Sequence, residues 1–406
     1  MNVKLKPLHE QVIVITGASS GIGLATARMA AKAGARLVLV ARNEEALKEI
    51  ERELDAGDTV KHLVGDVGKR EDLERVASQT ITQFGGFDTW INNAGSSVWG
   101  RLDEVSDEDH EKVMQTNFFG TMYGSNIAAR HLRDKGGAII NIGSVESAAA
   151  MPFHSSYSAS KHAVKAMTDV LRVELEQSGS PVSVTLVRPP AINTMFNDHA
   201  KSYLPSAPSF PPPVYSPDVV AQAILHAAVH PQRDVYIGNS KMFTRMAQVT
   251  PRLADLMSRT FIYDIVQSGR PDKHRGGTLH NSDVGTVQDG QASGQYPGHV
   301  KQTSLYTRAT QHPVATALIA VGAIALIASL IGSKRMKSSK GMPALGAMAG
   351  LKGSKNMKHV HMPRMRKTHR RGGLFGTGLK LAALGQGARL SHQAGKVSGA
   401  VRSRLP

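Results

Sequence analysis

A tyrosine and a lysine stand four residues apart in the stretch YSASKHAV, which has the composition of a small-residue helix. Side chains at positions i and i+4 of a helix share one face, so Lys161 can place its charge beside Tyr157. The reference pKa of tyrosine is about 10, and a nearby cation favours the phenolate. The spacing predicts proton transfer, for which a positioned acid or base contributes about 10²–10⁴-fold in rate. Taken alone, the pair is equally typical of a solvated helix surface.

A glycine-rich turn near the N-terminus indicates a second kind of chemistry. In TGASSGIG, residues 16–23, three glycines follow an apolar strand and lead into a helix. Glycines permit a tight turn and close backbone approach, while the helix N-terminus offers free N–H groups to a pyrophosphate. A dinucleotide is therefore the expected ligand. The spacing is Gly-x3-Gly-x-Gly and differs from the common Gly-x-Gly-x2-Gly fingerprint.

Three motifs in this order, TGASSGIG, NNAG at 92–95 and YSASK at 157–161, make residues 8–240 resemble the short-chain dehydrogenase/reductase family. The resemblance implies a catalytic tetrad in which Asn117, from TNFFG, and Ser144, from NIGS, join Tyr157 and Lys161. In that family the tyrosine exchanges a proton with the substrate oxygen, and the serine polarises that oxygen. The lysine contacts the nicotinamide ribose, and the asparagine holds a water. The neighbouring His154 is assigned no role.

The resemblance also implies the cofactor contacts. Asp66 accepts from the adenine amino group, although capping of the following helix is a competing explanation. In RPPAINT, Thr194 contacts the nicotinamide end, but Pro190 replaces the usual glycine and removes an N–H. The implied cofactor-binding residues are Gly17, Ser19, Ser20, Gly21, Ile22, Gly23, Arg42, Asp66, Val67, Asn93, Ala94, Gly95, Tyr157, Lys161, Pro189 and Thr194. No metal site is expected.

The end of the second expected strand bears on the choice of nicotinamide cofactor. NAD-binding chains usually present a carboxylate there to the ribose hydroxyls, and this charge would repel the 2′-phosphate of NADP. In VARNEEA, Ala41 occupies that position and Arg42 follows, whose guanidinium can bind a phosphate through two parallel hydrogen bonds. NADP(H) is favoured over NAD(H), although Glu44 or Glu45 could reach back and weaken this preference.

These motifs need a framework of alternating strands and helices. Short apolar runs alternate with longer helical segments, as in parallel sheets that are covered on both faces. We expect a Rossmann-type, doubly wound α/β fold with seven parallel strands at 12–16, 36–41, 61–65, 89–94, 137–143, 182–188 and 234–238. The expected helices are 22–33, 43–56, 69–84, 107–134, 155–177 and 216–229.

The remainder of the chain is expected to fall into distinct parts around a catalytic domain at 1–240. The proline-rich stretch 192–217 suits a substrate lid or, alternatively, a surface loop. Residues 241–312 are interpreted as an extension and linker, with two short helices within 242–265. Residues 314–331, VATALIAVGAIALIASLI, are uncharged and would span roughly 27 Å as a helix, against a hydrocarbon core of about 30 Å. A membrane segment is therefore expected at 313–332, and a disordered basic tail at 333–406.

The charge distribution indicates where the protein acts. The net charge is +17, and residues 333–406 alone contain 17 Lys and Arg with no Asp or Glu. Basic residues directly after the apolar run favour anionic lipid, at about 1 kcal/mol each, whereas nucleic-acid motifs and interleaved aromatics are missing from the tail. The N-terminus lacks the apolar core of a secretory signal, which favours a cytoplasmic catalytic domain. The positive-inside rule conflicts with this for a single crossing, so the topology stays open.

The expected function is that of an NADP(H)-dependent oxidoreductase that interconverts a carbonyl and a secondary alcohol, on a lipophilic small molecule at a membrane. The absence of cysteine excludes disulfides and thiolate chemistry. The resemblance implies a homo-oligomer formed through helices 107–134 and 155–177. The alternative is a non-catalytic NADP-binding scaffold or sensor whose tail binds anionic lipid or nucleic acid. The filled tetrad argues against it.

Overall fold

The computed structural model describes residues 3–54, 57–273, 275–281, 289–311 and 316. Within this part, seven parallel strands form the central sheet in the order β10-β7-β6-β4-β1-β2-β3. Their bounds are β1 Val12–Thr16, β2 Arg36–Ala41, β3 Val60–Val64, β4 Thr89–Asn92, β6 Gly137–Ile142, β7 Val182–Arg188 and β10 Asp234–Tyr236. The predicted α/β fold is confirmed. The strand order reverses at β1, where β2 and β4 leave in opposite directions, and a crevice at such a point binds ligands in this class of sheet.

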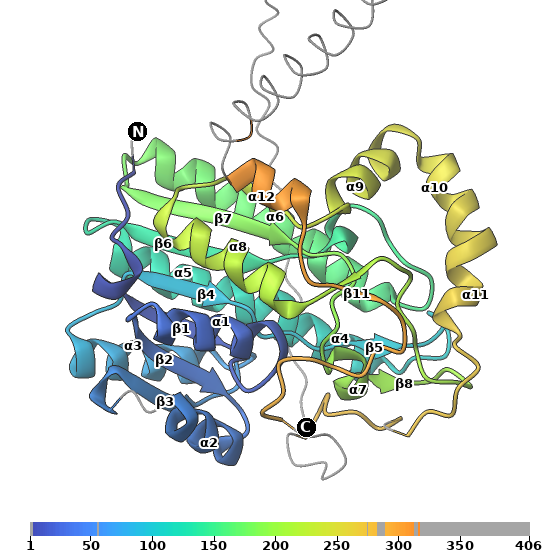
Figure 1. Ribbon diagram of the computed structural model, residues 1–406, viewed down its shortest axis with the longest axis horizontal. Helices are drawn as coiled ribbons and strands as arrows, with labels where there is room; N and C mark the ends of the chain where they lie inside the picture. Colours follow the sequence, from blue (N-terminus) through green and yellow to red (C-terminus); the bar gives the residue numbers. More distant parts are fainter. Residues whose placement is uncertain (1–2, 55–56, 274, 282–288, 312–315, 317–406) are drawn as a thin grey trace, which may run out of the picture. The chain divides into compact units, whose positions relative to one another are not determined.

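Helices cover both faces of the sheet (Figure 1). One face packs against α1 (Gly21–Lys32), α2 (Glu44–Leu54) and α8 (Pro217–Val229). The other packs against α3 (Arg70–Phe84), α5 (Gly120–Leu132) and α6 (Ser155–Gln177). Since both faces of the central strands are buried, these strands carry apolar side chains at most positions, and for this reason they could be recognised in the sequence.

The helix expected at 107–134 is interrupted by one wider turn. It consists of α4 (Asp107–Met114), a π-helical turn (Gln115–Phe119) and α5. Ser106 caps α4, because its hydroxyl accepts from the N–H of Asp109. The π turn contains Asn117, whose side chain is fully buried. Single π turns occur frequently at functional sites, and here the turn sets the position of a predicted catalytic residue.

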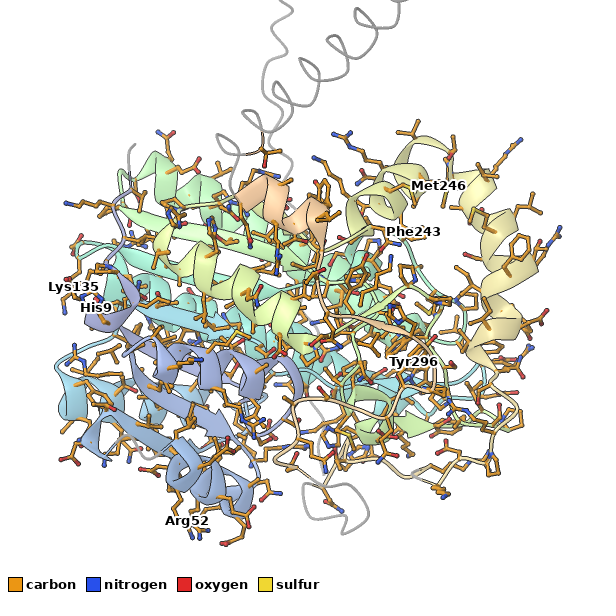
Figure 2. All side chains as sticks on the ribbon, in the orientation of Figure 1. His9, Arg52, Lys135, Phe243, Met246 and Tyr296 are labelled. Carbon is orange, nitrogen blue, oxygen red and sulfur yellow. The ribbon has the colours of Figure 1, made fainter. Side chains whose placement is uncertain are left out.

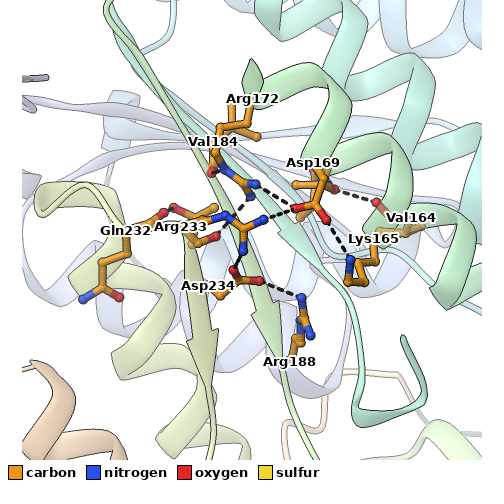
Figure 3. Close-up of polar contacts among 12 residues, drawn as sticks. Val164, Lys165, Asp169, Arg172, Val184, Arg188, Gln232, Arg233 and Asp234 are labelled. Carbon is orange, nitrogen blue, oxygen red and sulfur yellow. Dashed lines mark hydrogen bonds and ion pairs between the residues drawn. The ribbon is translucent and has the colours of Figure 1, made fainter. Parts of the chain in front are cut away.

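A network of ion pairs fixes α6 to the edge of the sheet (Figure 3). Arg172 of α6 donates to the carbonyl of Val184 in β7 at 2.9 Å and to the carboxylate of Asp169 at 2.8 Å. Arg188 at the end of β7 donates to Asp234 of β10 at 2.7 Å. Arg188 is only 2% exposed, so this pair lies largely out of water. The bond from Arg172 to Val184 holds the helix that carries Tyr157 and Lys161 against the sheet, while the Arg188–Asp234 pair joins β7 to β10.

Beyond β10 the chain forms helices and then returns over the domain. The helical part consists of α9 (Ser240–Val249), α10 (Pro251–Met257), a second π-helical turn (Ser258–Ile262) and α11 (Tyr263–Val266). Farther on, β11 (Val300–Lys301) pairs with β9 (Val214–Tyr215), and α12 (Leu305–Gln311) follows. A second short pair joins β5 (Val98–Trp99) to β8 (Lys201–Ser202). A four-residue helix, α7 (Phe196–His199), precedes β8.

Asp109 of α4 ties these added segments to the catalytic domain. Its carboxylate accepts from the hydroxyl of Tyr203 at 2.6 Å and from His280 Nε2 at 2.7 Å, and it pairs with Lys201 at 2.7 Å. Burial acts to raise the pKa of Asp109, but these hydrogen bonds and the charge of Lys201 outweigh it and lower that pKa to about 2. The carboxylate thus stays charged. It joins both the 201–203 stretch and the extension to α4.

Within the described residues, no helix combines the length and the apolar character needed to cross a membrane. The membrane segment predicted at 314–331 and the basic tail at 333–406 lie outside these residues, apart from Thr316.

Candidate active site

The glycine-rich turn is built so that side chains cannot replace its three glycines. Gly17 and Gly21 have φ values of +64° and +57°, a region that favours glycine. A Cβ on Gly23 would lie 2.1 Å from the carbonyl oxygen of Gly17 and 2.6 Å from Asn93 Nδ2. The amide of Asn93 donates to the carbonyls of Thr16 and Gly17 at 3.0 Å each. The turn is therefore held open, with the N-terminus of α1 directly behind it.

Asp66 and Arg42 lie on the same side of this turn, after β3 and β2. The carboxylate of Asp66 accepts from the N–H of Gly68 at 2.9 Å and from Lys112 Nζ at 3.1 Å. Burial acts to raise the pKa of Asp66, but the Gly68 hydrogen bond and the charge of Lys112 outweigh it and hold that pKa below its usual value. Asp66 is consequently ionised at neutral pH and keeps the capacity to accept a hydrogen bond from a ligand.

Tyr157, Lys161 and Ser144 converge at the carboxyl end of the sheet. Lys161 Nζ lies 5.5 Å from the centroid of the Tyr157 ring and donates to the carbonyl of Ile142 at 2.8 Å. The side chain of Ser144 lies beside that of Tyr157, close enough to lower the pKa of the phenol. The i, i+4 spacing thus places the cation over the phenol without direct contact with its oxygen.

Burial controls the charge of this centre. It raises the pKa of Tyr157 well above its ordinary value, the charge of Glu146 raises that pKa further, and the hydrogen bond from Ser144 lowers it. Burial also lowers the pKa of Lys161, to about 8, although Glu146 acts in the opposite direction. Near neutral pH the site therefore holds a protonated phenol beside a protonated lysine. Such a phenol is a proton donor to a ligand oxygen.

Asn117 lies behind this centre. Its Oδ1 accepts from the N–H of Ser96 at 2.8 Å, and its Nδ2 donates to the carbonyl of Ser96 and to Ser160 Oγ at 3.0 Å each. The side chain thus connects the π turn, the loop after β4 and α6. A Cβ on Gly95 would come within 3.4 Å of Asn117 Oδ1 and 3.9 Å of Lys161 Nζ, so little space separates the three residues.

A cavity of about 590 Å³ joins the glycine-rich turn to the tyrosine. Every catalytic and cofactor-binding residue predicted from the sequence lines it, except Gly23 and Asn117. Its far wall is apolar and comes largely from the stretch 192–217, expected as a substrate lid, and from the extension, including α9, whose Phe243 and Met246 are labelled in Figure 2. One continuous cavity can thus hold an extended dinucleotide together with a second molecule next to Tyr157.

The described part of the extension passes directly over the glycine-rich turn. The N–H of Gly21 donates to the carbonyl of Gln291 at 3.0 Å, and the N–H of Gly290 donates to the carbonyl of Ser19 at 2.9 Å. Tyr296, labelled in Figure 2, donates its N–H to Asn193 Oδ1 at 3.0 Å. The extension therefore follows the surface of the expected cofactor site, whereas the sequence indicated only an extension and linker.

Asp289 of this extension lies beside the residues expected to bind the adenosine end of a dinucleotide. Its carboxylate accepts from Asn43 Nδ2 at 2.9 Å and from Ser19 Oγ at 3.5 Å. The guanidinium of Arg42 donates to the carbonyls of Thr278 and Leu279 at 2.6 and 3.2 Å. At this corner of the cavity, the donors of Ser19, Arg42 and Asn43 thus bind the Asp289 carboxylate and two backbone carbonyls of the extension.

Glu146 and His154 are cavity-lining residues to which the sequence analysis gave no role. Both are buried, and His154 Nδ1 lies 3.0 Å from the carboxylate of Glu146. The available signal was an acidic residue two positions after Ser144, in a loop that follows a buried strand. An ionisable residue in such a loop is unusual as a packing residue.

Comparisons with known proteins agree with this geometry. A family model described as short chain dehydrogenase matches residues 11–203. The uncharacterized oxidoreductase YxnA of Bacillus subtilis is 43% identical over 333 residues, which cover 80% of this chain and 92% of that protein. An 11-beta-hydroxysteroid dehydrogenase A of Sesamum indicum is 42% identical over 182 residues, or 44% of this chain and 51% of that protein. The alignment with YxnA is long enough to include part of the extension.

Two solved structures share the fold. An alcohol dehydrogenase from the archaeon Thermococcus sibiricus, complexed with 5-hydroxy-NADP, is 28% identical with a TM-score of 0.50, over 56% of this chain and 95% of that one. A short chain dehydrogenase/reductase from Burkholderia phymatum, in complex with NAD, is 25% identical with a TM-score of 0.55, over 61% of this chain and 96% of that one. Nicotinamide dinucleotides of both kinds are thus bound by proteins with this fold.

Proposed function

Since the chain belongs to the short-chain dehydrogenase/reductase family and is an oxidoreductase of that class, we propose that it interconverts a lipophilic ketone and the corresponding secondary alcohol with NADP(H). The observation that carries this proposal is the single cavity in which the glycine-rich turn, Ser144, Tyr157 and Lys161 meet. The test is a screen of lipophilic ketones with the full-length protein, in which consumption of NADPH is followed by its absorbance.

The residues present fit a nicotinamide dinucleotide, because the turn has no room for side chains at Gly17 and Gly23 and lines the cavity. The carbonyl of Gln291, which accepts from the N–H of Gly21, must withdraw when a pyrophosphate binds there. When bound, this cofactor supplies or accepts a hydride at the substrate carbon. In the direction of reduction, Tyr157 gives its phenolic proton to the substrate oxygen, while the hydroxyl of Ser144 hydrogen-bonds to that oxygen. The charge of Lys161 stabilises the phenolate that remains. In oxidation, the same phenolate takes the proton back.

The preference for NADP(H) is supported by Arg42 and its neighbours. Arg42, Ser19 and Asn43 bring a guanidinium, a hydroxyl and an amide together at one end of the cavity. These are donors for a 2′-phosphate, and a guanidinium can bind one through two hydrogen bonds. Asp289 occupies the same corner, so its carboxylate must withdraw when a 2′-phosphate binds there. The carbonyls of Thr278 and Leu279, which accept from Arg42, must withdraw as well.

Two substitutions with opposite effects test this preference. We expect Arg42→Ala to weaken binding of NADPH by on the order of 10-fold, since a hydrogen bond to a charged group contributes about 1.5–3 kcal/mol, and to change NADH binding little. Asp289→Asn removes a like charge, and we expect it to strengthen NADPH binding. Dissociation constants for both cofactors, measured by fluorescence titration, provide the check. Equal losses of NADPH and NADH affinity in Arg42→Ala would contradict the assignment.

A lipophilic substrate is supported by the composition of the cavity wall opposite the glycine-rich turn. The wall consists largely of apolar side chains. Met151 comes from the loop before α6, Phe196 and Phe210 from the lid region, and Phe243, Met246, Met257 and Ile262 from the extension. Apolar walls with few polar groups favour ligands that bury apolar area. The name of the Sesamum indicum relative refers to a hydroxysteroid, which carries a secondary alcohol on an apolar ring skeleton. A sterol-like, retinoid or acyl-chain carbonyl is therefore the first substrate class to test.

Association with a membrane, with the catalytic domain in the cytoplasm, is part of the same proposal. It is supported by the uncharged run 314–331 and the basic residues that follow. Large apolar side chains are also exposed along α9–α11, at Met242, Val249, Leu253, Leu256, Phe261, Tyr263 and Ile265. Exposed Val170 and Val173 on α6 support the further proposal of a homo-oligomer that associates through this helix.

The membrane proposal predicts that the full-length protein sediments with membranes after gentle cell lysis and stays there in high salt. Apolar insertion persists in salt, whereas attraction of the basic tail alone is screened. Immunoblots of pellet and supernatant, before and after the salt wash, provide the measurement. Recovery of the protein in the unwashed supernatant would refute membrane association, and release by salt would refute insertion.

A further inference from the structure

A buried polar cluster lies beside Tyr157 and takes no part in the proton transfer described above. Glu146 lies in the 3-10 turn η4 (Val145–Ser147), and His154 directly precedes α6. They are 3% and 1% exposed. His154 Nδ1 lies 3.0 and 3.1 Å from the two carboxylate oxygens of Glu146, and its Nε2 contacts the hydroxyl of Ser97. Ser158 Oγ donates to the same carboxylate at 2.6 Å. Both ring nitrogens of the histidine are therefore held by named partners.

The imidazole of His154 is stacked between two aromatic rings. The ring of Trp99 lies 3.8 Å from it, centroid to centroid, at an interplanar angle of 6°. The phenol ring of Tyr157 lies 4.3 Å from it at 15°. Phe196 meets Tyr157 edge-on, at 5.4 Å and 64°. The plane of the phenol thus depends on a histidine whose own orientation is fixed by Glu146 and Ser97.

Stability alone does not account for this cluster. Removal of a carboxylate from water costs free energy that apolar side chains of similar volume do not incur, so a buried pair of this kind is weak evidence for a stabilising role. Glu146 is also joined to the reaction centre through its backbone, because its N–H donates to Ser144 Oγ at 3.1 Å. One short turn therefore links the serine that contacts Tyr157 to the carboxylate that holds the ring stacked on Tyr157.

We propose that Glu146 and His154 form a positioning pair for Tyr157, in which His154 holds the plane of the phenol ring, and Glu146 fixes the imidazole and presents a buried negative charge to the reaction centre. This inference rests on the proposed function, because the pair is proposed to orient Tyr157 for its proton transfer to the substrate. Neither residue exchanges a proton with the substrate.

The charge of Glu146 has a defined effect on both ionisable residues of the site. It raises the pKa of Tyr157 and that of Lys161, so it keeps protons on both. The titratable groups facing Tyr157 are Glu146 from η4, and His154 and Lys161 from α6 and its N-terminus; α7 presents the uncharged Phe196. Burial is the largest cause of the raised pKa of Tyr157, so the phenol is protonated at neutral pH in any case, and the charge of Glu146 acts mainly on the alkaline pH limb of oxidation.

The experiment compares wild type with Glu146→Gln, which keeps the shape and removes the charge, as full-length protein. With NADP⁺ and a lipophilic secondary alcohol found by the substrate screen, oxidation requires the phenolate. Removal of Glu146 lowers the pKa of Tyr157, so we expect the rising limb of kcat against pH to move to lower pH while the KM for NADP⁺ stays unchanged. At neutral pH the phenol stays protonated in both proteins, so we expect kcat for reduction to change far less than the about 10²–10⁴-fold that a positioned acid contributes.

A second readout does not depend on any substrate. In full-length protein labelled with ¹³Cζ-tyrosine, the signal of Tyr157 is the one that Tyr157→Phe removes. We expect its titration to begin at lower pH in Glu146→Gln than in wild type. A failed substrate screen would therefore count against the proposed function and leave the positioning pair testable.

Four further variants complete the experiment. Glu176→Gln changes an exposed carboxylate on the same helix and is expected to match wild type. Glu146→Asp keeps the charge and is expected to retain the wild-type pH limb even if kcat falls. His154→Phe keeps a stacked ring and is expected to retain more activity than His154→Leu. An unchanged pH limb and an unchanged Tyr157 titration in folded Glu146→Gln would overturn the proposal, as would equal activities of the two His154 variants.

Discussion

Replacement of Tyr157 by phenylalanine is expected to lower kcat by about 10²–10⁴-fold or more, because the phenol is the proposed proton donor and a positioned acid contributes that much. Affinity for NADPH should stay close to wild type, since the ring that stacks on His154 remains. Turnover with a ketone from the substrate screen and a separate NADPH titration measure the two quantities. The expected outcome is a loss confined to the chemical step.

Tyr306→Phe provides the matched control for this variant. Tyr306 lies in α12 and does not line the cavity. Its variant should therefore retain wild-type turnover. Normal turnover in Tyr157→Phe would show that another group supplies the proton, and the assignment of the site would then be wrong.

Gly23→Ala is expected to abolish most cofactor binding. A Cβ at this position would lie 2.1 Å from the carbonyl oxygen of Gly17, and backbone at such a distance has to shift. Overpacking of this kind costs about 1–3 kcal/mol, which corresponds to roughly 5–150-fold in affinity if it falls on the bound state. Titration with NADPH measures the loss, and thermal unfolding without cofactor measures how much of the cost falls on folding itself.

Gly276→Ala provides the control for the glycine variant. A Cβ at Gly276 meets nothing within 4 Å, so the added methyl group should be harmless. Wild-type NADPH affinity in Gly23→Ala would mean that the turn does not approach the cofactor as its geometry requires.

The residues predicted from local spacing are those that the structure brings together. The central strands bury both faces, so their apolar runs could be recognised without knowledge of their neighbours, whereas the edge strands β3 and β10 are only partly buried. Tyr157 and Lys161 share a helix, and their relation follows from helical periodicity alone. Ser144 directly follows a buried strand, so the sheet fixes its position.

Features that depend on long-range contacts could not be predicted in the same way. Glu146 and His154 are eight residues apart across a loop, and only the folded loop brings the carboxylate to the imidazole. Asp289 meets Asn43 across 246 residues of chain, from a segment with little periodicity. The π turn at Asn117 is a local departure from α-helix that the apolar pattern of 107–134 does not reveal. In all three cases tertiary packing decides the position of the side chain.

The central proposal is that a hydride passes between NADP(H) and a carbonyl carbon in the cavity beside Tyr157, while Tyr157 transfers the proton. Its most direct test uses NADPH carrying deuterium at the transferable C4 position and a lipophilic ketone, with the alcohol product examined by mass spectrometry and NMR. Wild type is expected to place one deuterium at the carbinol carbon for each NADPH consumed, and Tyr157→Phe is expected to form almost no product. Alcohol without deuterium at that carbon, or a labelled product formed equally well by Tyr157→Phe, would contradict it.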